Sequence, residues 1–102
     1  MTTSRYLLPA ILELERAVDR YADRSPPVAA AFFDAIRSGV ERLETFPKSA
    51  PVFEAPVRRL VLQTYPFSVL YYLKDDTIVI VAIMHHKQEP GYWHDRVRAE
   101  PK

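Results

Sequence analysis

Ile78-Val79-Ile80-Val81-Ala82-Ile83-Met84 is the longest uninterrupted apolar run in the chain. Its seven residues are far fewer than the roughly 18 that a membrane-spanning helix needs. β-Branched residues dominate the run, which favours a strand, and the lack of polar alternation is typical of a strand buried on both faces. The run therefore predicts the central strand of a sheet.

The segments before this run also have the composition of strands. Residues 67–73 are aromatic and β-branched, and the polar connection 74–77 predicts a hairpin with the central strand. Residues 57–65 predict a third strand, after which Pro66 marks a turn or bulge. Residues 4–8 are a weaker candidate for a further strand. Residues 47–56 hold three prolines and are interpreted as a linker.

The first half of the chain has the period of two amphipathic helices. Pro9 suits the first turn of one helix, and Ser25 predicts the N-cap of the next, which ends at Phe46-Pro47. The apolar stripe of the first helix is Ile11, Leu14, Val18 and Tyr21, and its solvated face is Arg16, Asp19, Arg20 and Asp23. The stripe of the second is Ala29, Phe33, Ile36, Val40 and Leu43, with Phe32 alongside. Gly39 favours close packing of helix on helix.

Helices followed by strands predict an α+β fold. We expect one domain over residues 1–102, in which an N-terminal helix hairpin packs on one face of a small antiparallel sheet and a short C-terminal tail follows. The other face of the sheet is expected to stay partly free, as a platform for a ligand or partner.

The composition excludes several classes of function. The chain has 102 residues, no cysteine and a net charge of +1. It therefore has no disulfide framework or thiolate metal site, and direct binding to nucleic acid is not expected without a local basic patch. The start of the chain lacks the apolar core of a signal peptide, so a cytoplasmic location is expected.

Polar and aromatic residues gather after the central strand, from His85 to Arg96. Neighbouring residues of a strand face opposite sides, so if the central strand continues to Lys87, His85 and Lys87 share one face and His86 takes the other. Arg58 and Arg59 would split in the same way. An arginine, a lysine and a histidine on one face could hold a phosphate and move a proton.

Each of these residues also has a structural explanation. Histidines at a strand end are commonly hydrogen-bonded edge residues, and Tyr92 and Trp93 could cap the core under the tail. Arg96 and Arg98 lie near the acidic Asp95 and could serve only to solvate a terminal helix. The histidines do not match a zinc pattern, Ser68 is not set in a nucleophile motif, and no glycine-rich phosphate loop is present. No cofactor or metal is expected.

Several motifs in order along the chain resemble one protein family. They are Val57-Arg58-Arg59-Leu60, Tyr65-Pro66-Phe67-Ser68-Val69 with Tyr71-Tyr72, the central strand, and His85-x-Lys87-x-x-Pro90-Gly91-Tyr92-Trp93. Together with the upstream helix hairpin that ends in Phe46-Pro47, this order resembles the RelE/ParE toxin superfamily over roughly residues 5–96. The long hairpin and the scarcity of basic residues on the predicted sheet are more similar to the ParE-like members.

The resemblance implies the toxin of a bacterial type II toxin–antitoxin system, of the kind that serves plasmid stabilisation. A ParE-like member is expected to inhibit DNA gyrase and to be neutralised by a cognate, ParD-like antitoxin. For this reading, Tyr92, Trp93 and Arg96 are the candidate target or partner surface.

Two alternatives remain within the same resemblance. A RelE-like member would be a ribosome-dependent mRNA endoribonuclease, with a site made from the basic and aromatic candidates Arg58, Arg59, His85, Lys87 and Tyr92. A degenerate toxin would only bind its antitoxin. Enzymatic activity is therefore left open, with a non-enzymatic toxin favoured.

Overall fold

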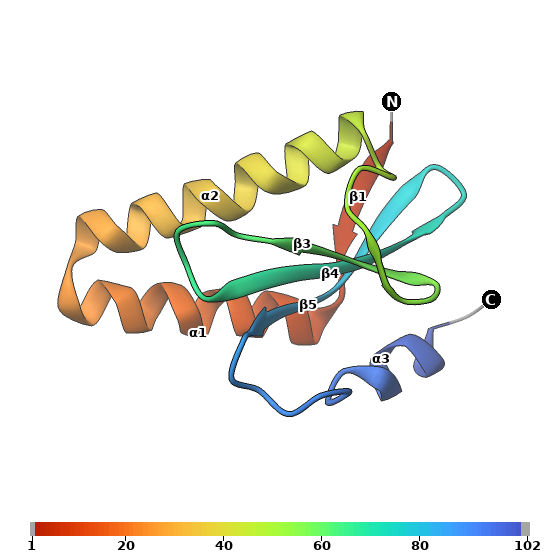
Figure 1. Cartoon of the computed structure of the whole chain (residues 1–102). Coiled ribbons are helices and arrows are strands. Elements are labelled where there is room, and N and C mark those ends of the chain that lie inside the picture. The colour runs from red at the N-terminus through yellow and green to blue at the C-terminus, as the bar shows by residue number, and fades with distance from the viewer. Residues whose placement is uncertain (1, 101–102) are drawn as a thin grey trace.

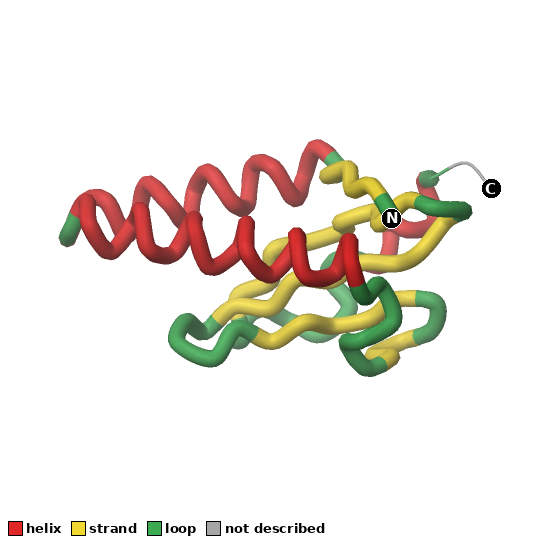
Figure 2. Tube along the Cα trace, turned by 90° about the horizontal axis from the view of Figure 1, so that it is seen from above, coloured by secondary structure: helices red, strands yellow, loops and turns green. Residues whose placement is uncertain are grey.

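The computed structural model describes residues 2–100 and arranges them as a helix hairpin against a sheet of five strands, with a short helix in the tail (Figure 1). The elements are β1 (Thr3–Tyr6), α1 (Leu8–Arg24), α2 (Pro26–Thr45), β2 (Val52–Glu54), β3 (Val57–Val61), β4 (Phe67–Lys74), β5 (Thr77–His85) and α3 (His94–Ala99). The strand order is β1-β5-β4-β3-β2. Seen from above, the helices and the strands form separate layers, and the hairpin extends beyond the sheet (Figure 2). The predicted α+β class is confirmed.

Strand β5 is the buried strand that the apolar run predicts. It lies between β1 and β4, and every residue from Ile78 to Met84 is buried. The hairpin with β4 turns through Asp75 and Asp76, and Asp75 has a positive φ of 56°. Aspartate adopts this left-handed conformation more readily than most residues, which explains the tight turn.

The sheet is mixed rather than wholly antiparallel. β1 runs parallel to β5, with Thr3 opposite Thr77 and Tyr6 opposite Ile80, whereas the other neighbouring strands are antiparallel. Parallel neighbours need a long crossover connection. Here the connection from β1 to β5 consists of the helix hairpin and β2 to β4. β1 pairs with the edge of β5 that β4 leaves open.

The region interpreted as a linker contains a strand. β2 pairs antiparallel with β3 across the turn at Ala55 and Pro56, and β3 ends at Val61 instead of continuing to residue 65. The side chains of β2 are all exposed, so the segment lacks the apolar alternation by which an edge strand is recognised. Pro66 lies in the turn before β4, as predicted.

The helix hairpin buries a different phenylalanine from the one predicted. Phe32 is fully buried and Phe33 is 45% exposed. The buried face of α2 runs through Ala29, Phe32, Ile36, Val40 and Leu43, at steps of three and four residues. Phe33 is displaced from this stripe by one residue, which is about 100° around the helix. The N-cap prediction is confirmed, since the Ser25 hydroxyl accepts a hydrogen bond from the Val28 amide.

Gly39 packs on the sheet and not on the other helix. A Cβ atom at this position would lie 2.9 Å from Cδ2 of Leu60 in β3. The absence of a side chain therefore lets α2 approach the strand closely. The expectation of close helix-on-helix packing at Gly39 was wrong about the partner.

A second core cluster covers the sheet face opposite the hairpin. Trp93 is 2% exposed and packs there with Leu70, Val81 and Met84, while Val97 of α3 lies at its margin. The tail thus occupies part of the face that was expected to stay free. Trp93 belongs to the core and not to the surface where the resemblance places it.

Candidate functional site

The end of β5 presents one histidine to each face of the sheet. His85 lies on the side of the helix hairpin, where its ring meets the edge of Phe67 at a centroid distance of 4.9 Å. His86 lies on the opposite side and contacts the hydroxyl of Ser68. The predicted opposite placement of His85 and His86 is confirmed, but the strand ends at His85 and does not continue to Lys87. Lys87 follows in a turn, and its amide donates to Nδ1 of His85 at 3.0 Å.

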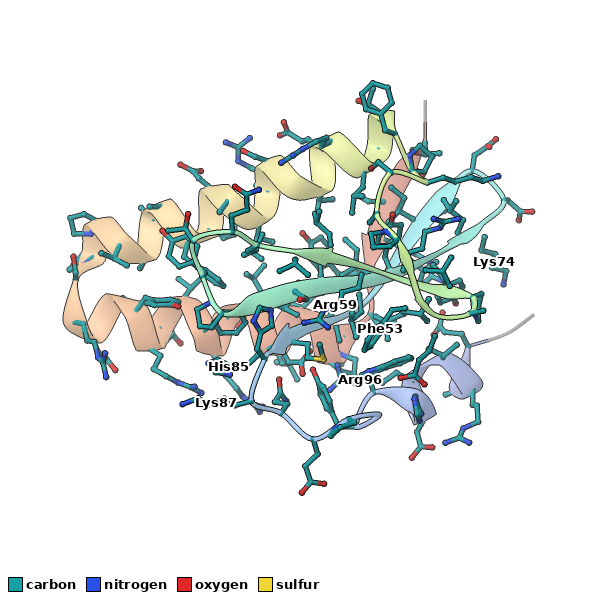
Figure 3. All side chains as sticks on the ribbon, viewed as in Figure 1. Phe53, Arg59, Lys74, His85, Lys87 and Arg96 are labelled. Carbon is teal, nitrogen blue, oxygen red and sulfur yellow. The ribbon has the colours of Figure 1, made fainter. Side chains whose placement is uncertain are left out.

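His85 and Lys87 lie at a cleft beside α1. The cleft has a volume of about 350 Å³, and its charged or titratable lining residues are Glu13, Arg16, Arg20, His85 and Lys87. Figure 3 shows His85 and Lys87 next to α1. The arginines were expected to be a solvated face only. Arg16 and Arg20 are four residues apart and therefore lie on the same side of α1, on either side of the buried Ala17. This spacing is the sequence signal that could have placed them over the end of the strand.

The environment of His85 disfavours its charged form. Burial lowers the pKa of the imidazole from 6.5, and the positive charges of His86, Lys87 and Arg20 lower it further. The hydrogen bond from the Lys87 amide also requires Nδ1 to be an acceptor. His85 is therefore neutral at pH 7, with its proton on Nε2.

This environment predicts a pH-dependent stability. The unfolded chain binds a proton on His85 at a higher pH than the folded chain does, so the free energy of unfolding should fall as the pH drops below 6.5. His85→Asn keeps an acceptor for the Lys87 amide, and its free energy of unfolding should fall less steeply as the pH drops. Urea unfolding of both proteins between pH 7 and pH 5 measures the difference. Identical slopes would contradict the prediction.

Glu13 of α1 is the hub of a partly buried polar cluster. Its carboxylate accepts two hydrogen bonds from Arg96, at 2.8 and 3.1 Å, one from the Tyr92 hydroxyl at 2.7 Å, and one from the Ile83 amide at 3.1 Å. The Arg96 guanidinium also lies over the Tyr92 ring. Glu13 thereby joins α1 to β5 and to the tail, a role that its place in a charge-rich helix did not reveal.

Tyr92 is held in its protonated form. Burial raises the pKa of its hydroxyl, and the Glu13 carboxylate that accepts its proton raises it further. A phenol in this state donates a hydrogen bond and does not act as a base near neutral pH. Tyr92 and Arg96 therefore lie together, as structural partners of Glu13.

Arg59 lies on the other face of the sheet, away from the cleft. Its Nε donates to Ser68 Oγ at 2.9 Å, and Ser68 Oγ is 2.9 Å from Nε2 of His86. The guanidinium stacks over Phe53, as Figure 3 shows. Ser68 itself is fully buried, so its hydroxyl orients its neighbours and is not exposed to a substrate.

Arg58 points to the helix side of the sheet, but it is bound by the backbone. Its Nη1 donates to the carbonyl oxygens of Lys48 and Ala50, at 3.2 and 2.7 Å. It thus fastens the segment before β2 to β3. The predicted split of Arg58 and Arg59 between the two faces is confirmed.

The residues proposed for a ribonuclease site do not all meet at one place, although Tyr92 bonds to Glu13, which lines the same cleft as His85 and Lys87. His85 and Lys87 line the cleft, Arg58 holds the backbone, Arg59 contacts Ser68, and Tyr92 bonds to Glu13. Among residues 2–100, no three His, Asp or Glu side chains are grouped to hold a metal ion. No helix within the described part of the chain is long and apolar enough to cross a membrane.

Residues 5–90 match the model of a family described as the ParE toxin of the type II toxin–antitoxin system parDE. The chain belongs to this family. A chain from a structure titled "Chromosomal ParDE TA system from P. aeruginosa" is similar to this ParE-family toxin, with 27% identity and a TM-score of 0.72. The alignment covers 83% of the toxin and 96% of that chain. No curated protein sequence matches it significantly.

The family match confirms the resemblance and defines its extent in this toxin. It includes both helices of the hairpin and all the strands from β2 to β5, together with His85 and Lys87. Tyr92, Trp93 and Arg96 lie after the matched residues. The polar cluster around Glu13 therefore connects a helix inside the matched region to a tail outside it.

Proposed function

We propose that this ParE-family toxin inhibits DNA gyrase and that a cognate antitoxin of the ParD kind neutralises it. The family match is the observation that carries the proposal. The similar chain from P. aeruginosa, which comes from a system named ParDE, supports it. A gyrase inhibitor acts where the chromosome is, so we also infer that the toxin works in the cytoplasm and serves plasmid or chromosome maintenance.

The dispersal of the basic residues favours a binding protein over a ribonuclease. General acid–base catalysis on a phosphodiester needs donors and acceptors within hydrogen-bond reach of the same reacting atoms. Here Arg58 and Tyr92 already bond to the protein's own oxygen atoms. Arg59 is directed to the other face from His85. A minimal catalytic set is therefore not assembled.

The helix hairpin offers an apolar surface for the antitoxin. Leu8, Ile11 and Leu12 are exposed on the first half of α1, whereas the exposed Val28 and Phe33 lie at the other end of the hairpin, at the start of α2. Apolar side chains that are exposed close together, as the three on α1 are, are typical of interaction sites. An amphipathic segment of an antitoxin could cover them, which would explain why the toxin alone leaves them in water.

A supercoiling assay tests the proposed target. Purified gyrase, ATP and relaxed plasmid are incubated with increasing amounts of the toxin. We expect the rate of supercoiling to fall by about tenfold when the toxin concentration is about ten times the dissociation constant of the inactive complex. Linear DNA released by detergent and protease should increase in parallel, since a trapped cleavage complex contains broken strands.

Two controls accompany this assay. Antitoxin encoded beside the toxin, added in equal amount, should restore supercoiling. The same toxin preparation in a translating extract should leave mRNA intact. Unchanged supercoiling, combined with cleavage of mRNA, would overturn the proposal in favour of a ribonuclease.

A further inference from the structure

A row of arginines follows one side of α1 above the end of β5. Arg16, Arg20 and Arg24 are separated by four residues each, which is about 6 Å along a helix axis. Arg16 and Arg20 line the cleft of about 350 Å³. Arg20 and Arg24 line a second hollow of about 130 Å³ that shares Phe67 and His85 with the first. The two hollows thus form one groove.

The cations of this groove have no carboxylate partner. Within residues 2–100, Arg16, Arg20, Arg24 and Lys87 form no ion pair, although all are exposed. Glu13 is the acidic residue of the lining, and four donors already occupy its oxygens. The lining of the groove therefore has more positive than negative side chains, although Asp19 and Asp23 lie beside it on α1 and the net charge of the chain is only +1.

The lowered pKa of His85 is consistent with the positive charge of the groove. Lys87 and Arg20 both lower the pKa of its imidazole, which shows that positive charges act on it from the turn and from α1. A neutral His85 keeps an N–H donor at Nε2. The groove thus combines arginine forks, a lysine and a neutral donor.

We propose that this groove binds the phosphate groups of single-stranded nucleic acid. Proteins that bind single strands without reading their sequence combine a cationic groove with aromatic side chains. Here Arg16, Arg20, Arg24 and Lys87 supply the charge, and the half-buried Tyr21, whose ring packs against the aromatic core, lines one end of the groove. A cleft of this volume admits a sugar–phosphate unit, whereas a duplex is far wider.

The lining favours a nucleic acid over an acidic peptide. Peptides that dock in grooves rely on apolar anchors as well as charge. The apolar residues under this groove are nearly inaccessible: Ala17 is 5% exposed, Ile83 1% and Phe67 7%. Charge is therefore the main property that the groove offers, and nucleic-acid backbones are bound chiefly through charge. The expectation of no direct nucleic-acid binding rested on the net charge, which does not describe this local arrangement.

Fluorescence anisotropy with the purified toxin and a labelled 12-mer of oligo-dT tests the proposal. With four cations engaged, the logarithm of the binding constant should fall with the logarithm of salt concentration with a slope of about −3. In Arg20→Gln, the slope should be smaller in size by about 0.7 and the affinity at 50 mM salt about tenfold lower. Oligo-rU should bind within a few-fold of oligo-dT, since the groove contacts phosphates.

Arg42→Gln is the matched control. Arg42 is also exposed and unpaired among the described residues, but it lies on α2 beside a different hollow, so its loss should leave binding unchanged. Equal loss in both variants, or no binding at 50 mM salt, would overturn the proposal. Tighter binding of a poly-glutamate peptide that also depends on Arg20 would overturn it in favour of an acidic protein partner. The assay contains no gyrase, so its outcome is independent of the proposed target.

Discussion

Glu13→Gln is expected to lower the free energy of unfolding by about 3 kcal/mol. The substitution keeps the size of the side chain but removes the charge that Arg96 pairs with, and the side chains of Glu13 and Arg96 are only 13% and 19% exposed. It also turns an acceptor of four donors into an amide, whose NH₂ group would face two of them. Urea unfolding followed by circular dichroism measures the loss.

Glu15→Gln provides the control for this prediction. Glu15 lies on the exposed side of the same helix and forms no ion pair in the described residues, so its replacement should change the free energy by less than about 0.5 kcal/mol. Combining Glu13→Gln with Arg96→Met should recover part of the stability, because the buried charge left without a partner is then removed. A Glu13→Gln variant as stable as Glu15→Gln would show that the cluster does not hold the tail.

Trp93→Ala should cost about 4 kcal/mol of unfolding free energy. Trp93 is 2% exposed and fills the core on the sheet face opposite the hairpin, against Leu70, Val81 and Met84. Its removal leaves a cavity and uncovers this face, since no other residue from 86 to 100 is buried there. Thermal unfolding measures the loss, and a dye that binds exposed apolar surface should report the uncovered strands.

Two variants separate packing from hydrogen bonding at this position. Trp93→Phe keeps an aromatic ring, and the indole Nε1 that it removes has no hydrogen-bond partner within residues 2–100. The unfolding free energy lost in Trp93→Phe should therefore be less than half of that lost in Trp93→Ala. Phe33→Ala removes an aromatic side chain that is 45% exposed on α2 and should have little effect. A stable Trp93→Ala protein would mean that the tail does not contribute to the core.

Local patterns predicted the elements whose signals repeat within one segment. The apolar run identified β5, because a strand with both faces covered has no polar alternation. Ser25 and the prolines after it identified the boundary between the helices. β2 was missed, since its exposed side chains carry no such signal. The prediction put Phe33 in the buried stripe in place of Phe32, because adjacent residues are only 100° apart around a helix.

The candidate site was predictable only where one segment contains it. Strand alternation placed His85 and His86 on opposite faces, and the structure agrees. The arginines that meet His85 come from α1 and not from β3. Arg58 and Arg59 are nearer to the family motifs in sequence, but the backbone and Ser68 hold them elsewhere.

The sequence alone determined the family, the α+β class and the buried strand from Ile78 to Met84, because these depend on patterns within short segments. Only the tertiary structure decided the parallel pairing of β1, the burial of Trp93 and the joining of Glu13 to Arg96. The last pair is separated by 83 positions. Such contacts depend on how α1, β5 and the tail pack in space, and packing between distant segments leaves no periodic trace in a single sequence.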